Sequence, residues 1–298
     1  MTSDDGHHLY ERRRLRRRVG FWRLVALLVL LVAVGGYLWQ SVPRGSYIAR
    51  HTVTGTIFDN PDRDALLRRV AEDRRAEALI LRIDSPGGTI AGSEALFEAV
   101  RAVAEQKPVV AVMGEVAASG GYIAALAADR IIARGNTITG SIGVIAEFPN
   151  FEGLLETVGV DFSRVASAPL KAEPSPLRAP SEAALAAQAD LVADSYDWFI
   201  GLVRARRDLD EDAASTVGDG RIFTGRQARE AGLIDDIGSE AEALDWLREA
   251  HGLSARLPVR DVRVRSMPSG VVDLLLGDGT RARLDRWLHG PRLMAIIP

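Results

Sequence analysis

The sequence predicts an α/β fold built on a parallel sheet, and two observations carry that prediction. Short apolar runs that suit buried strands, such as 78–83 and 108–113, alternate with longer segments whose apolar residues recur at helical spacing. Parallel strands need a crossover between them, so this alternation predicts βαβ units with right-handed connections. The composition is that of a globular protein, with 47% hydrophobic and 26% charged residues.

Each expected element follows from its local pattern of apolar, polar and turn-forming residues. In chain order we expect strand 51–58, helix 61–77, strand 78–83, helix 90–106, strand 108–113, helix 118–128, strands 130–134 and 141–146, helix 151–158, strand 161–166, helix 181–208, a turn and short strand at 218–225, helices 226–232 and 240–251, and strand 259–265. The segment 168–180 contains four prolines and is expected to be a loop.

The amino end predicts a membrane anchor. An arginine cluster at 12–18 precedes an apolar segment, 21–40, that is long enough to cross a bilayer and has aromatic residues near both ends. A cleaved signal peptide is the alternative, but the bulky residues at 37–40 make a poor cleavage site. The positive-inside rule then predicts a single-pass protein of the cytoplasmic membrane, with its amino end in the cytoplasm and its body extracytoplasmic.

This reading divides the chain into five parts and bears on its partners. They are a basic cytoplasmic tail at 1–20, a transmembrane anchor at 21–40, a linker at 41–50, the main domain at 51–256 and a C-terminal extension at 257–298. The first 23 residues carry a net charge of +4 out of a total of −3, so the remainder carries −7. An acidic body argues against nucleic acid as a partner.

Two features of the composition limit the chemistry. The chain has no cysteine, which excludes disulfides, a cysteine nucleophile and thiolate metal sites. Among its 37 basic residues only Lys107 and Lys171 are lysines. A lysine can act as a base once it is desolvated, whereas arginine stays protonated.

Ser119 is the candidate nucleophile. The segment 114–122, GEVAASGGY, follows a buried strand and opens a helix, so the turn would expose the Ser119 hydroxyl. The two following glycines would let a substrate backbone approach closely. The alternative is that Ser119 merely caps the helix, since serine is a favoured N-cap residue.

A glycine loop is expected beside Ser119. The segment 84–88, DSPGG, ends the preceding strand, and the carboxyl ends of parallel strands meet at one edge of a sheet. Backbone N–H groups of such a loop can stabilise an oxyanion. The alternative is an ordinary Pro-Gly turn.

A serine hydroxyl needs a base, and the choice is narrow. None of the five histidines, at 7, 8, 51, 251 and 289, lies between the first strand and the last helices, which disfavours a Ser–His–Asp triad. Lys107 directly precedes a strand and belongs at the opposite edge of the sheet. Lys171 lies in the proline-rich loop, where it is either a base or a solvated surface lysine.

Taken together, these motifs resemble bacterial signal peptide peptidase A in its short, single-domain form. The resemblance covers about 51–250 and rests on DSPGG at 84–88, AASGGY at 117–122, TGSIGV at 139–144, Lys171, and DGRIFTGRQAREAGLID at 219–235. It implies a crotonase/Clp-protease-like fold of stacked βαβ units, which makes 51–256 a protease domain. One departure is that Ile123 follows Tyr122, where many relatives have a second tyrosine.

The resemblance also implies the roles of individual residues. Ser119 would be the nucleophile and Lys171 the general base of a Ser–Lys dyad, with Ser141 orienting the lysine. Gly87 or Gly88, together with Gly120, would supply the oxyanion hole, and Tyr122 would contact substrate. The resemblance implies no metal and no cofactor, and a homo-oligomer, because the long form of the family fuses two copies of this domain.

The expected function is that of a membrane-anchored serine endopeptidase. The resemblance implies cleavage of hydrophobic peptides, such as signal-peptide remnants left in the membrane, or alternatively of membrane proteins. Two other functions fit the same fold: an acyl-CoA enzyme, although CoA is cytoplasmic, and a membrane-tethered scaffold without activity.

Overall fold

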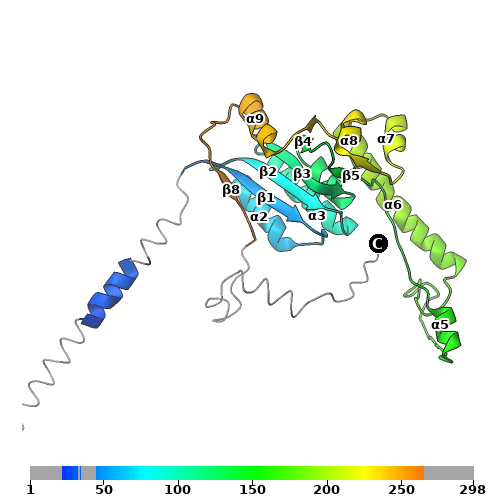
Figure 1. Cartoon of the computed structure of the whole chain (residues 1–298). Coiled ribbons are helices and arrows are strands. Elements are labelled where there is room, and N and C mark those ends of the chain that lie inside the picture. The colour runs from blue at the N-terminus through cyan, green and yellow to red at the C-terminus, as the bar shows by residue number, and fades with distance from the viewer. Residues whose placement is uncertain (1–21, 33, 35–44, 265–298) are drawn as a thin grey trace, which may run out of the picture. The chain divides into compact units, whose positions relative to one another are not determined.

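The computed structural model describes residues 22–32, 34 and 45–264 (Figure 1). The chain divides into two units, 1–45 and 46–298. In the first unit, residues 22–32 are helical. Among the described residues no helix is both long and apolar enough to cross a membrane, and the rest of the predicted anchor at 21–40 lies outside them.

The second unit is organised around an eight-stranded sheet (Figure 1). Its central strands are β1 (Tyr47–Thr54), β2 (Ala76–Ser85) and β3 (Val109–Ala118), which pair in parallel. The short strands are β4 (Arg130–Ala133), β5 (Ile138–Gly140), β6 (Ile222–Thr224), β7 (Asp236–Ile237) and β8 (Val259–Asp261). The strand order is β6-β5-β3-β2-β1-β8, with β4 joining β3 to β7. Only the β5–β6 pair is antiparallel among the described pairs, so the predicted α/β fold with a parallel sheet is confirmed.

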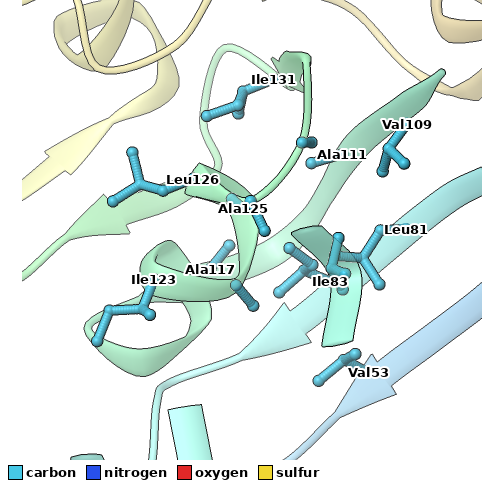
Figure 2. Close-up of a cluster of buried hydrophobic side chains, with 14 of the residues drawn as sticks. Val53, Leu81, Ile83, Val109, Ala111, Ala117, Ile123, Ala125, Leu126 and Ile131 are labelled. Atoms are coloured by element: carbon cyan, nitrogen blue, oxygen red, sulfur yellow. The ribbon is translucent and has the colours of Figure 1, made fainter. Parts of the chain in front are cut away.

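Both faces of the central strands are buried, which explains their continuous apolar runs. In β2, Leu79, Leu81 and Ile83 enter the larger core cluster, whereas Ala78 and Ile80 enter a smaller one. The larger cluster, part of which Figure 2 shows, is covered by the helices α2 (Pro61–Glu72), α3 (Ile90–Ala104) and α4 (Gly120–Leu126). The smaller cluster is covered by α9 (Glu240–His251).

An arm made by residues 141–181 leaves the sheet after β5, and its helix α5 (Glu152–Thr157) lies apart from the strands (Figure 1). The arm returns through α6 (Glu182–Arg207), which leads to α7 (Glu211–Val217) and α8 (Gly225–Glu230). The predicted strands 141–146 and 161–166 are wrong, because these segments are extended or irregular without pairing to a neighbouring strand. In 161–166 the apolar side chains of Phe162 and Val165 are exposed, whereas in 141–146 Ile142 is buried in the larger core cluster without strand pairing.

Candidate active site

Ser119 lies between the end of β3 and the start of α4. Its backbone has φ 51° and ψ −119°, a conformation that non-glycine residues seldom adopt. The Ser119 N–H donates to the carbonyl of Gly140 at 2.8 Å, so pairing of β3 with β5 continues to the serine and holds this turn. Its side chain makes no capping hydrogen bond to the helix, which contradicts the alternative that Ser119 serves only as an N-cap.

The glycine loop after β2 packs directly on Ser119. Gly87 has φ +117°, and a Cβ placed on it would lie 2.9 Å from the Ser119 Cβ and 3.0 Å from the Gly120 nitrogen. A Cβ on Gly88 would lie 1.9 Å from the Ile57 carbonyl oxygen. The loop therefore needs glycine at both positions, for a positive φ at Gly87 and for close approach of backbones at both.

The N–H groups of this region differ in whether they are already used. Gly87 N–H donates to the Ser85 hydroxyl at 3.1 Å, so it is not available to an oxyanion. In the described part of the chain, Gly88 N–H and Gly120 N–H have no acceptor. A Cβ on Gly120 would lie 3.2 Å from the Gly88 nitrogen, so these two free donors are close together beside Ser119.

Ser85 supports the glycine loop and was not singled out from the sequence. Its side chain is fully buried, donates to the Gly55 carbonyl at 2.6 Å and accepts from Gly87 N–H. These two bonds fix the start of the glycine loop against the end of β1. The signal was present in the sequence, because a hydroxyl directly before Pro-Gly-Gly can bond a backbone N–H two residues on.

Ser141 lies beside Ser119 across the strands. Gly140 pairs with Ala118, so the two serines each follow a member of the same parallel pair. Ser141 also has a positive φ of 50°, and its N–H donates to the Arg221 carbonyl at 2.8 Å. A positive φ is unusual for serine, and here it occurs at two adjacent strand ends. Strained backbone conformations of this kind persist only where the surrounding structure enforces them, and they cluster at functional sites.

Lys171 lies on the arm, and its side chain is exposed. Among the described residues its amine has no hydrogen-bond or ion-pair partner, so a single chain does not form the predicted contact with Ser119. Lys107, in contrast, donates to the carbonyls of Val70 and Asp73 at 2.7 and 2.9 Å, near the amino end of β3. The Lys107 amine therefore holds two backbone carbonyls together. It lies at the edge of the sheet opposite Ser119, as expected from the sequence.

Tyr122 is not available to substrate, which corrects the prediction made for it. The side chain is fully buried, and its hydroxyl donates to the Leu233 carbonyl at 2.7 Å. Burial raises the pKa of the Tyr122 phenol. In α4 the residue lies three positions after Ser119, on the side of the helix that faces the core.

A cavity of about 560 Å³ lies along the same edge of the sheet as Ser119. It is lined by the carboxyl end of β1, the residues after β8, and Ile57, which forms a bridge with Gly88. His51 lies in the wall of this cavity and is 6% exposed. Its Nδ1 lies 3.0 Å from the Val262 carbonyl oxygen. Since a carbonyl only accepts, Nδ1 carries the proton and Nε2 faces away from that bond.

Comparison with known proteins finds a family and several relatives. The profile of peptidase family S49 matches residues 101–254. A Synechocystis protein named as a protease is 42% identical over 210 residues, which are 69% of this chain and 75% of that protein. An Enterococcus faecium protein named as the signal peptide peptidase SppA is 36% identical over 189 residues, 63% of this chain and 55% of that protein. The chain thus spans about half the length of this second relative. A solved structure of a mutant membrane-bound stomatin-specific protease superposes with a TM-score of 0.48 at 16% identity, over 74% of this chain and 99% of that one.

Proposed function

The chain belongs to peptidase family S49, which confirms the predicted serine protease. From this premise we propose that it is a membrane-anchored endopeptidase with Ser119 as nucleophile and Lys171 as general base. One observation carries the proposal. The Ser119 backbone has a positive φ, and two backbone N–H groups without an acceptor among the described residues, those of Gly88 and Gly120, lie beside this serine. A peptidase needs this pairing of a presented nucleophile with donors for the developing oxyanion.

The proposed reaction proceeds through an acyl-enzyme. The neutral amine of Lys171 takes the proton from the Ser119 hydroxyl as its oxygen attacks the peptide carbonyl. The resulting oxyanion is held by Gly88 and Gly120 N–H, each worth about 3–4 kcal/mol in comparable sites. The protonated lysine then gives its proton to the leaving amine. Water, activated by the same amine, releases the acyl group and restores both side chains.

We further propose that Lys171 reaches Ser119 in a homo-oligomer. The amine has no partner in the part of its own chain that the structure describes, and the arm that carries it exposes many large apolar side chains. They include Phe148, Phe151, Leu154, Val158, Phe162 and Val165. Many exposed apolar side chains in one segment are typical of an interface with another protein. Contact between copies would cover the arm and desolvate the lysine, which favours the neutral amine that a base requires.

The proposed substrates are hydrophobic peptides at the membrane surface. The predicted anchor at 21–40 would hold the protease domain next to the extracytoplasmic face of the cytoplasmic membrane. Remnant signal peptides are such substrates, and one relative carries the name of a signal peptide peptidase. Segments of membrane proteins are the alternative. A peptidase family is a poor match for the acyl-CoA chemistry that the fold alone would also allow.

Two substitutions test the dyad. Ser119→Ala and Lys171→Ala should each lower kcat/KM on a fluorogenic hydrophobic peptide by at least about 1,000-fold, with the oligomer intact by light scattering. Substantial hydrolysis by Lys171→Ala would refute the role of the lysine.

Mixing the two variants tests where the dyad forms. If each site takes Ser119 from one copy and Lys171 from another, random co-assembly of equal amounts restores activity to about one quarter of the wild-type value. If both residues come from the same chain, the mixture stays inactive.

A further inference from the structure

The loop that carries Lys171 contains one carboxylate that is unusually buried for its surroundings. The Glu173 side chain is 4% exposed, although α5 contains no buried residue and most side chains of the arm face solvent. Carboxylates are seldom buried unless they are paired. The burial of Glu173 within an exposed arm therefore calls for a reason beyond solubility.

Glu173 is held by three donors, one that precedes it in the sequence and two that follow it. Its Oε1 accepts from Arg164 Nη1 at 2.6 Å and also from Arg178 Nη2. Its Oε2 accepts from the Ser175 N–H at 3.1 Å. One carboxylate thus joins a residue before the loop, Arg164, to two residues within it, Ser175 and Arg178, through charge-assisted hydrogen bonds.

The same network reaches the residues on either side of Glu173. Arg164 Nη1 also donates to the Ala172 carbonyl at 3.3 Å, and Gln188 Nε2 on α6 donates to the Glu173 carbonyl at 3.5 Å. Ala172 has φ 55°, a conformation that persists only where the surroundings enforce it. Since Ala172 directly follows Lys171, these bonds set the direction in which the lysine leaves the loop.

We propose that Glu173 is a positioning residue: by clamping Arg164, Arg178 and the backbone at 172–175, it fixes the loop that presents the Lys171 amine. This inference rests on the proposed function, in which Lys171 is the base. Without the carboxylate, two guanidinium groups are left uncompensated against each other, and Arg164 Nη2 is already buried without a partner in the described part of the chain. The loop then loses its single geometry.

The test compares Glu173→Gln with a matched control in the full-length protein. Glu152→Gln removes a second carboxylate of the arm, whose Oε2 accepts from the Ala179 N–H at 2.9 Å in the same proline-rich loop but away from Lys171. We expect Glu173→Gln to lower kcat about 10- to 100-fold with KM within about twofold, because misplacing a catalytic group by about 1 Å costs this much. We expect Glu152→Gln to leave both constants unchanged.

A second readout separates positioning from folding. Phosphonylation of Ser119 by a small fluorophosphonate needs the base but little substrate binding, so its rate should fall with kcat in Glu173→Gln, while size and melting temperature of the oligomer stay those of the control. Arg178 is 43% exposed, so Arg178→Gln is a milder variant that folds more safely and should lower the same rate by a smaller factor.

The failures of the two proposals are distinguishable in the same panel. If Lys171→Ala is inactive and Glu173→Gln keeps wild-type kcat, or loses activity only by dissociating, the positioning role is overturned and the dyad stands. If Lys171→Ala keeps its activity, the dyad itself is overturned, and with it the role of Glu173.

Discussion

Gly87 and Gly252 form a matched pair for testing how closely the glycine loop controls Ser119. Both have a positive φ, +117° at Gly87 and +66° at Gly252, where alanine is strained. They differ in their surroundings. A Cβ on Gly252, the residue that ends α9, would meet nothing within 4 Å, whereas a Cβ on Gly87 would lie 2.9 Å from the Ser119 Cβ.

The magnitudes follow from these distances. Alanine at either position should cost about 1–3 kcal/mol of unfolding free energy for the backbone strain alone. Two carbons rest about 3.5–4.0 Å apart, so Gly87→Ala must also move Ser119 or the loop by roughly 0.6 Å or more. A displacement of that size at a nucleophile should lower its reactivity about 10- to 100-fold.

The assay measures stability and reactivity separately. Urea unfolding gives the free energy of each variant, and the rate of fluorophosphonate labelling, followed by intact mass, gives the reactivity of Ser119. We expect Gly87→Ala to be less stable and slow to label, and Gly252→Ala to be less stable but normally reactive. Equal labelling rates in the two variants would show that the glycine loop does not set the geometry of Ser119, and the oxyanion argument would fail with it.

Two further predictions concern buried side chains. Tyr122→Phe should lower the unfolding free energy by about 1–2 kcal/mol, because the buried Leu233 carbonyl loses its donor, while kcat/KM stays within about twofold; a loss of kcat/KM at unchanged stability would restore a substrate-binding role to the residue. For His51, burial lowers the pKa below the ordinary 6.5, so the folded state binds fewer protons than the unfolded state. Its stabilising effect is therefore complete above about pH 6.5 and is lost as the pH falls toward the folded pKa. The urea midpoint should drop between pH 7.5 and 5.5 in the wild type and drop less in His51→Asn, which keeps a donor for the Val262 carbonyl; equal drops would exclude His51 as the cause.

The sequence was sufficient to place Ser119 and the glycine loop, because both follow buried strands whose apolar runs are unmistakable. Adjacent parallel strands then bring Ser85 and Ala117 into register, and with them the two loops. Ser141 was singled out only by the family resemblance, and the strand that brings it beside Ser119, β5, ends just before it and was not predicted. Strand ends are predictable because the register of a buried sheet is tightly specified.

The sequence was misleading where packing, not periodicity, decides. The resemblance implied a substrate contact for Tyr122, but in α4 its side chain is buried in the core and its hydroxyl donates to the Leu233 carbonyl. The segments 141–146 and 161–166 alternate like strands, yet they have no neighbouring strand to pair with in this chain. The partners of Lys171 could not be derived from either source, because its surroundings within one chain are solvent.

The exposed position of Lys171 bears on the life of the protein before assembly. If Lys171 acts on Ser119 only between copies, as proposed, a newly made chain is inactive, because no amine in its described part is bonded to that serine. Peptidase activity would then appear only when enough copies are present in the same membrane to form the oligomer. At low concentration the separate chains would stay inactive.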